Sequence, residues 1–335
     1  MTRKLTLVKG SPWFALLAVF LVQTFSAAVN FSIPPLTPFI QSTFALTRAQ
    51  IGLLISALFI GSAVMSIPAG GLTDRIGVRR MLFISLASIG VLLVLAAQSR
   101  SFPEMFTLLL VMGVAYSGVA PSTSKGVLEW FETKRRATAM GVKQSGVTIG
   151  SLGVALTLPW LALTLGWRLS MSILGVVACA AGVAVFWLYR EQTLNRVRLA
   201  PSKLGGRGAL RATLRNRNLL LFSSLALVFA ATQLSLVTYL VLYLTEMFAF
   251  TVVLAGFMLA LVNGAGTVGR IFFGYLSDRV FRGSRKKTMV LVGSFTTAMT
   301  LIFSLVSPGM AVWIILPVIA ALGLVALGHN AVMMT

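Results

Sequence analysis

Cysteine and histidine are almost absent from this sequence of 335 residues, which contains one of each. The single cysteine, Cys179, lies in an apolar run, and one cysteine excludes both an intrachain disulfide and a cysteine-based metal site. No nucleophile, base and orienting group converge along the sequence, and no cluster of metal ligands is recognisable. We therefore expect no enzyme, no metal site and no bound cofactor.

Acidic residues are scarce as well, because seven Asp and Glu stand against 28 Lys and Arg, and the isoelectric point is about 11.7. A nucleic-acid-binding protein needs a basic patch on a soluble surface, surrounded by polar groups that read the bases. Here the basic residues lie in loops between apolar runs, and only 10% of all residues are charged. The sequence therefore predicts no nucleic-acid partner and is unlike that of a soluble domain.

Long apolar stretches dominate instead, with 57% hydrophobic residues and a mean hydropathy of +0.93. A helix needs about 20 mostly apolar residues to span a bilayer. Breaks at charged and at Pro- or Gly-rich points predict about ten such helices, at 13–40, 51–69, 81–98, 104–126, 137–163, 169–189, 219–245, 252–276, 288–306 and 310–330. The start of the chain resembles a signal peptide, but nine further spans favour a membrane anchor.

The distribution of Lys and Arg predicts the orientation of these spans. Loops rich in Lys and Arg stay in the cytoplasm. Basic residues gather in the loops on the side of the N-terminus, whereas the opposite side has only Arg48, Arg100 and Arg168. We therefore expect a multi-pass protein of the cytoplasmic (inner) membrane with its N-terminus in the cytoplasm.

The longest hydrophilic stretch runs from Arg190 to Asn218 and contains little that can pack as a core. It predicts a basic cytoplasmic linker at 191–218, between an N-terminal six-helix bundle at 1–190 and a partial C-terminal bundle at 219–335. Its charge can hold it near anionic lipid headgroups, although the positive-inside rule explains that charge without a specific partner.

A short motif occurs twice. Gly70-Gly71-Leu72-Thr73-Asp74-Arg75, followed by Gly77, is matched by Gly274-Tyr275-Leu276-Ser277-Asp278-Arg279. Each copy is a basic loop between two apolar stretches. This arrangement predicts two related membrane halves, which is the architecture of a transporter.

The doubled motif resembles the signature loop of the major facilitator superfamily. The resemblance implies an all-α fold with two pseudo-symmetric six-helix bundles around a central cavity, and rocker-switch alternating access. It also implies a cytoplasmic latch made of Gly70, Asp74, Arg75, Gly77, Gly274, Asp278 and Arg279. Six plus six helices need two more after Thr335, so we expect a fragment or truncated product in which Asp74 lacks its partner, the eleventh helix. The alternative is a tight turn whose charges only set the topology.

Arg270 lies inside the apolar stretch 252–276, where a charge is costly and by default faces a cavity or a partner. The segment from Asn263 to Arg279 resembles the corresponding helix of monocarboxylate and oxalate/formate transporters, in which such an arginine binds the substrate carboxylate. The planar guanidinium suits that task. The matching position in the first half is Ser66, so the charge belongs to one half only. The alternative is an arginine that snorkels to the cytoplasmic interface.

Lys143 lies about 9 Å into the span 137–163, and with Gln144 it is a candidate for the same anion unless it reaches the interface. The spacing of Gly146, Gly150 and Gly153 predicts a close-packing face. The remaining candidate substrate-binding groups are polar side chains within the spans, each of which also suits a helix–helix hydrogen bond. They are Gln23, Asn30, Gln233, Tyr239 and Asn263.

Lys125 can pair with Glu129, one helical turn further on, and is expected at the membrane interface rather than in a functional site.

None of the seven acidic residues lies in the middle of a span, whereas exporters of cationic drugs need a buried carboxylate. We therefore predict a monomeric secondary transporter that moves a small organic anion, most simply a carboxylate, through the lipid bilayer. Exchange of anions, or symport in which the substrate carboxylate itself carries the proton, fits better than proton transfer through an acidic residue of the protein. Coupling to protons is left open. The alternatives are a multidrug/proton exporter of the same superfamily and a non-transporting sensor or truncated product.

Overall fold

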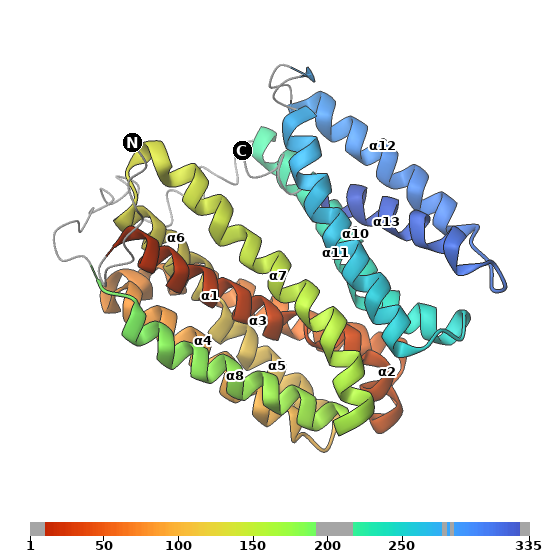
Figure 1. Cartoon of the computed structure of the whole chain (residues 1–335), viewed down its shortest axis with the longest axis horizontal. Coiled ribbons are helices and arrows are strands. Elements are labelled where there is room, and N and C mark those ends of the chain that lie inside the picture. The colour runs from red at the N-terminus through yellow and green to blue at the C-terminus, as the bar shows by residue number, and fades with distance from the viewer. Residues whose placement is uncertain (1–10, 192–216, 277–279, 282–284, 329–335) are drawn as a thin grey trace, which may run out of the picture. The chain divides into compact units, whose positions relative to one another are not determined.

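The computed structural model describes residues 11–191, 217–276, 280–281 and 285–328, and every element within these ranges is a helix (Figure 1). Nine segments of this part of the chain are long and apolar enough to cross a bilayer, and one further apolar helix, Val312–Gly328, is shorter. The predicted all-α membrane architecture is confirmed.

The helices follow the predicted spans closely. They are α1 (Pro12–Asn30), α2 (Ile33–Phe44), α3 (Arg48–Ile76), α4 (Val78–Ala97), α5 (Phe102–Tyr116), α6 (Val119–Trp130), α7 (Thr133–Leu165), α8 (Trp167–Leu188), α10 (Arg217–Met247), α11 (Val252–Tyr275), α12 (Arg285–Ser304) and α13 (Val312–Gly328). Each of the ten predicted spans has a counterpart. The first and the fourth are each divided, into α1 and α2 and into α5 and α6, and the prediction of one continuous helix was wrong for these two.

Prolines explain the division of the first span. Proline has no N–H, so Pro34 and Pro35 cannot donate to the carbonyls four residues before them, and the helix stops at Asn30 and restarts at Ile33. A third proline, Pro38, lies within α2 and removes the donor for the carbonyl of Pro34. The Thr37 hydroxyl replaces it, donating to the Pro34 carbonyl at 2.8 Å.

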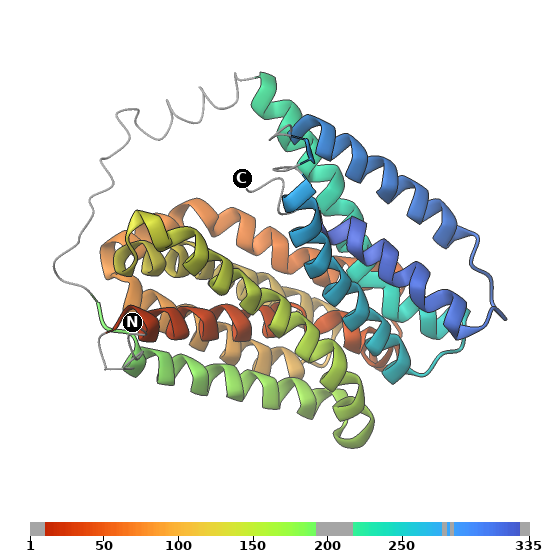
Figure 2. The ribbon, with the colours of Figure 1, turned by 45° about the horizontal axis from the view of Figure 1, so that its top comes forward.

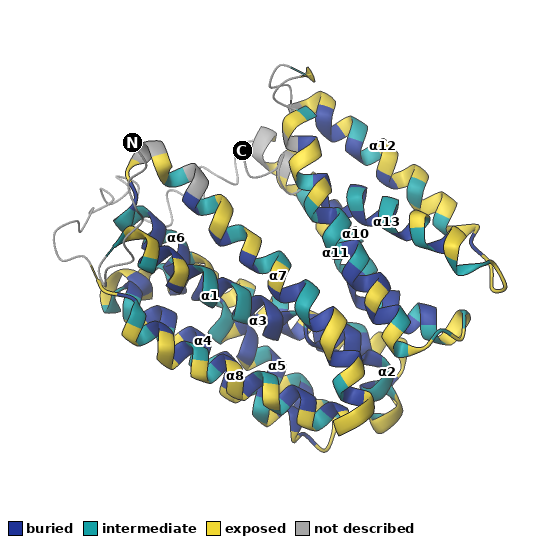
Figure 3. Cartoon of the chain, viewed as in Figure 1, coloured by how far each residue is buried: buried dark blue, intermediate teal, exposed yellow. Residues whose placement is uncertain are grey.

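The chain divides into two compact units, of which unit 1 contains residues 1–195 and 241–260. Within unit 1, α1 contacts α4, α6, α7 and α8, and α4 lies beside α8 (Figures 1 and 2). In Figure 3, α1 is dark blue and teal over most of its length, whereas exposed yellow residues recur along α7 and α8. Helix α1 is therefore the core of this unit, and the exposed apolar faces of α7 and α8 suit contact with lipid.

Two connections in unit 1 consist of a single glycine. Gly77 joins α3 to α4 with φ of 90°, and Gly166 joins α7 to α8 with φ of 83°. A residue with a Cβ is strained at such positive φ values, so glycine is required at both turns.

Unit 2 contains residues 196–240 and 261–335. Its core is a cluster from four helices, formed by Phe229, Phe273, Met289, Val292 and Val325. Helices α11 and α13 meet through glycine, because a Cβ at Gly269 would collide with the backbone of Leu324. The predicted boundaries at 190 and 218 stay a prediction, and most of the predicted linker lies outside the described residues.

The contact between α4 and α8 yields a stability test. A Cβ built at Gly90 would lie 2.6 Å from the Cys179 sulfur and 2.6 Å from the Gly175 carbonyl oxygen, so Gly90→Ala must push the two helices apart. We expect a loss of about 1–3 kcal/mol, seen as a lower melting temperature in detergent. Gly153→Ala in α7 is the matched control, because a Cβ there meets nothing within 4 Å, and helix propensity favours Ala by about 1 kcal/mol. Equal melting temperatures for both variants would contradict the packing of α4 on α8.

Candidate functional site

Lys143 is a buried cation in unit 1. Its side chain lies on α7 and is 7% exposed, and its Nζ donates a hydrogen bond to the Ser124 hydroxyl oxygen of α6 at 2.8 Å. In the described part of the chain the ion pairs are Arg48–Glu246 and Lys125–Asp74, so no carboxylate neutralises Lys143. A buried ammonium that meets only a hydroxyl is costly, and an anion from outside would offset that cost.

Small residues bring Lys143 into the bundle. Gly146 and Gly150 lie three and seven residues after it, on the same face of α7. A Cβ at Gly146 would lie 2.9 Å from the Thr24 hydroxyl of α1, and one at Gly150 would collide with the Thr24 carbonyl. These two predicted packing positions are confirmed. The prediction was wrong for Gly153, because a Cβ there meets nothing within 4 Å.

A second polar contact lies next to the first. Thr123, which precedes Ser124 on α6, places its hydroxyl 3.2 Å from Oε1 of Gln23 on α1. Gln23 is 6% exposed and Thr123 is fully buried. Two predicted residues, Gln23 and Lys143, thus meet consecutive residues of α6, at a junction where α1, α6 and α7 contact one another in pairs.

The other predicted residues of unit 1 are less closely joined to this junction. Asn30 is buried at the end of α1, and Gln144 is half-buried on α7.

The remaining predicted substrate residues belong to unit 2. Arg270 is half-buried on α11, and its Nε donates to the carbonyl oxygen of Leu327, in the last described turn of α13, at 3.3 Å. Asn263 is half-buried seven residues before Arg270, on the same face of α11. Gln233 and Tyr239 are half-buried on α10. The Leu327 contact was not expected, because a backbone carbonyl leaves no mark in the sequence.

The latch residues are only partly described. Asp74 forms an ion pair with Lys125 of α6, with Oδ1 and Nζ 2.6 Å apart. The expected pair of Lys125 with Glu129 was wrong, because α3 brings Asp74 within reach. The Glu129 carboxylate instead accepts a hydrogen bond from the Tyr189 hydroxyl at 3.1 Å. Burial, and after it the charge of Glu129, raises the pKa of the Tyr189 phenol, which therefore remains a proton donor.

The glycines of the two motifs behave differently. Gly77 forms the turn between α3 and α4, and a Cβ built there would collide with the Glu191 carboxylate. A Cβ at Gly70, by contrast, meets no described atom within 4 Å, so no other described helix packs closely against α3 at this position. Arg75 is exposed in the last turn of α3. Gly274 lies near the end of α11, and Asp278 and Arg279 lie outside the described residues.

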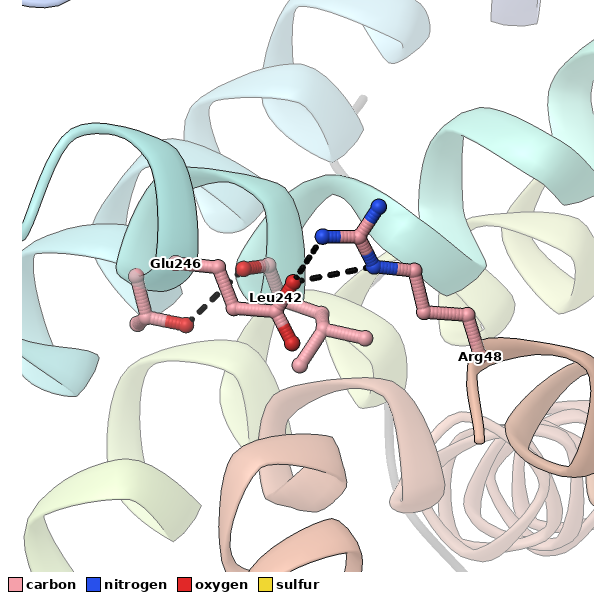
Figure 4. Close-up of polar contacts among 4 residues, drawn as sticks. Arg48, Leu242 and Glu246 are labelled. Atoms are coloured by element: carbon pink, nitrogen blue, oxygen red, sulfur yellow. Dashed lines mark hydrogen bonds and ion pairs between the residues drawn. The ribbon is translucent and has the colours of Figure 1, made fainter. Parts of the chain in front are cut away.

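One ion pair of unit 1 was not predicted. Arg48 at the start of α3 donates from Nε and Nη2 to Oε2 of Glu246, at 3.0 and 2.6 Å (Figure 4). The two residues are 198 positions apart, so no local sequence signal reveals the contact. In the same unit, a Cβ at Gly256 of α11 would lie 2.6 Å from the ring of Pro159 on α7. Both contacts fix residues 241–260 to the helices of the first half of the chain.

A group of three or more His, Cys, Asp or Glu residues suited to a metal ion is absent from the residues searched, which are those described.

Comparison with known proteins places these residues in a family context. The model of the Major Facilitator Superfamily matches residues 19–335. The "Probable L-galactonate transporter" of Escherichia coli (strain K12) is 26% identical over 337 residues, covering 92% of this chain and 71% of that protein. The "Gallate transporter" of Pseudomonas putida is 27% identical over 207 residues, covering 59% and 46%. The chain thus spans only 46% to 71% of the length of these two relatives.

Solved structures share the fold. A bacterial homolog of the human lysosomal transporter Spinster, in an inward-facing and unoccupied conformation, superposes with a TM-score of 0.77. The match covers 97% of this chain and 75% of that chain at 20% identity, so it shows the fold alone. The predicted fold class is confirmed.

The Arg48–Glu246 ion pair gives a test by charge reversal. Arg48→Glu places two carboxylates together and is expected to lower the melting temperature, and Glu246→Arg in the same chain is expected to restore it. The recovered free energy of unfolding should stay below about 1 kcal/mol, because the Arg48 side chain is 67% exposed. Melting curves of the two single variants and the double variant measure this coupling. A double variant no more stable than the single variants would argue against the pair.

Proposed function

The chain belongs to the Major Facilitator Superfamily, and from this premise we propose that it is a secondary active transporter of a small organic anion, specifically a carboxylate. Rocker-switch alternating access is the proposed mechanism. The protein crosses the membrane several times and is not an enzyme.

The buried Lys143 carries this proposal. In a medium with an effective dielectric constant of 20, two unit charges 4 Å apart attract by about 4 kcal/mol. An anion placed beside Lys143 therefore gains far more than it would in water, and it supplies the negative charge that the described part of the protein does not. The two relatives are named for gallate and L-galactonate, both of which carry a carboxylate.

Arg270 is the proposed second cation. Its Nε contact with Leu327 fixes the plane of the guanidinium against α13, which suits a group that binds a planar carboxylate. The other groups proposed to contact the substrate are neutral and polar. They are Gln23, Asn30, Gln144, Gln233, Tyr239 and Asn263.

The doubled motif is the proposed conformational latch. Its residues are Gly70, Asp74, Arg75, Gly77, Gly274, Asp278 and Arg279. The ion pair of Asp74 with Lys125 ties α3 to α6 and gives the latch a contact within unit 1.

The scarcity of acidic residues bears on the coupling mechanism. Each described acid that falls within a span lies at most two residues from the end of that span, as Asp74 in α3 and Glu104 in α5 do. Exchange of anions, or symport in which the substrate carboxylate carries the proton, is therefore the proposed mode. We propose further that the protein acts as a monomer in the cytoplasmic membrane with its N-terminus in the cytoplasm.

Removing the Lys143 charge tests the anion assignment. Lys143→Gln in the full chain is expected to reduce uptake of labelled gallate or galactonate into proteoliposomes at least tenfold, and Lys143→Arg is expected to retain more activity because it keeps the charge. The control is Lys287→Gln, which removes an exposed lysine at the start of α12. Wild-type uptake by both Lys143 variants would remove the main support for an anionic substrate. Uptake of organic cations alone would favour the exporter, and no uptake of either class would favour the non-transporting alternative.

The topology is tested with a pair of exposed arginines at the two ends of α4, Arg80 and Arg100. After Cys179→Ala, the variants Arg80→Cys and Arg100→Cys each carry one thiol. An impermeant maleimide applied to intact cells is expected to label position 100, and to label position 80 only after permeabilisation. The reverse pattern would place the N-terminus outside.

A further inference from the structure

At the junction of α1, α6 and α7, the Thr123 hydroxyl faces more hydrogen-bond acceptors than it has hydrogens to donate. Its hydroxyl oxygen lies 2.7 Å from the Val119 carbonyl, 3.2 Å from the Ala120 carbonyl and 3.2 Å from Oε1 of Gln23. A hydroxyl has one hydrogen to donate. The shortest of these contacts is the one to Val119, in the same helix, so the hydrogen points there.

This assignment decides how the Gln23 amide is oriented. With the Thr123 hydrogen on Val119, two oxygens would face each other at 3.2 Å without a hydrogen between them. The oxygen and nitrogen of a Gln amide are assigned from the hydrogen-bond network, and a half-turn of the amide exchanges them. Turned in this way, Nε2 of Gln23 donates to the Thr123 oxygen. The Gln23 oxygen then points away from Thr123 as a free acceptor, on a residue that is 6% exposed.

Counting hydrogens and acceptors at the neighbouring residue, Ser124, identifies hydrogen-bond donors that have no acceptor yet. Nζ of Lys143 donates to the Ser124 oxygen, so the Ser124 hydrogen must point elsewhere. An ammonium has three N–H groups, and one of those of Lys143 is used by Ser124. The junction thus offers the remaining N–H groups of Lys143 and the O–H of Ser124 as donors, and the Gln23 oxygen as an acceptor.

A carboxylate accepts hydrogen bonds and donates none, so it complements Lys143 and Ser124 but not the Gln23 oxygen. A hydroxyl group can donate. Consecutive residues of an α-helix point about 100° apart, so Gln23 and Lys143 approach α6 from two sides.

We propose that Gln23 is a specificity-determining residue that accepts a hydrogen bond from a hydroxyl group of the transported anion, so that the substrates are hydroxylated carboxylates. The inference rests on the proposed function, because it takes Lys143 as the group that binds the carboxylate. An anion without a hydroxyl lacks this hydrogen bond to the amide of a residue that is only 6% exposed, which disfavours its binding. Thr123 acts as a positioning residue, because its oxygen orients the amide.

Matched acids that differ by one hydroxyl group test this inference. Lactate is compared with propionate, and gluconate with 2-deoxygluconate, by calorimetric binding to the purified full chain in nanodiscs. We expect at least one hydroxy acid to bind about tenfold tighter than its deoxy partner, which corresponds to 1.4 kcal/mol. Gln23→Leu is expected to bring this ratio close to one by weakening the hydroxy acid alone. Thr123→Val, which keeps the shape of the side chain, should lower the ratio by a smaller factor, and monodispersity and melting temperature verify that both variants fold.

The outcomes separate this inference from the proposed function. Lys143→Gln is expected to weaken both members of a pair equally, because both carry the carboxylate. If the deoxy acids bind as well as the hydroxy acids, or if Gln23→Leu and Thr123→Val leave the ratio unchanged, Gln23 does not read a hydroxyl, while the anion carrier stands. If none of the four acids binds and Lys143→Gln has no effect on uptake of any anion, the proposed function fails, and the role of Gln23 fails with it.

Discussion

The interior of a bilayer supplies no water, so each polar group within the membrane needs a partner from the protein or from a ligand. This constraint explains why the described chain is helical throughout, since a helix satisfies its own backbone. It also explains local details. Where Pro38 removes a backbone donor, Thr37 supplies a hydroxyl. Where glycine lets α7 approach α1, the polar side chains between them meet hydroxyl groups of α6.

The same constraint bears on four basic side chains, which differ in their burial and in the groups that they contact. Arg48 at the start of α3 and Lys125 within α6 both meet carboxylates. Arg270 is half-buried and contacts a backbone carbonyl. Lys143 is the most deeply buried of the four and meets a hydroxyl. In each ion pair one of the two side chains is well exposed, so the paired charges lie near water. The buried Lys143, which meets a neutral hydroxyl, fits the proposed site in which a ligand supplies the negative charge.

Hydropathy predicted the number and position of the spans because the length of an apolar run is a local property. Pro34 and Pro35 mark the break in the first span, but hydropathy averaged over about 20 residues does not register two prolines. The error at Lys125 has a different cause, because the spacing rule considers one helix and the true partner, Asp74, comes from another. The contact of Arg48 with Glu246 depends entirely on how distant segments pack, and no pattern in one sequence encodes it. For the candidate site, the residue types were predictable but their hydrogen-bond partners were not.

The single glycine between α7 and α8 has a mechanical consequence. One residue spans at most about 3.6 Å, so α7 cannot slide along α8 at that end and can only pivot about Gly166. Lys143 lies about 35 Å along α7 from this pivot, at about 1.5 Å per residue. A tilt of about 5° would therefore move the ammonium by about 3 Å, roughly the length of one hydrogen bond. A small rotation of α7 at one face of the membrane would thus be enough to make or break a contact near the other.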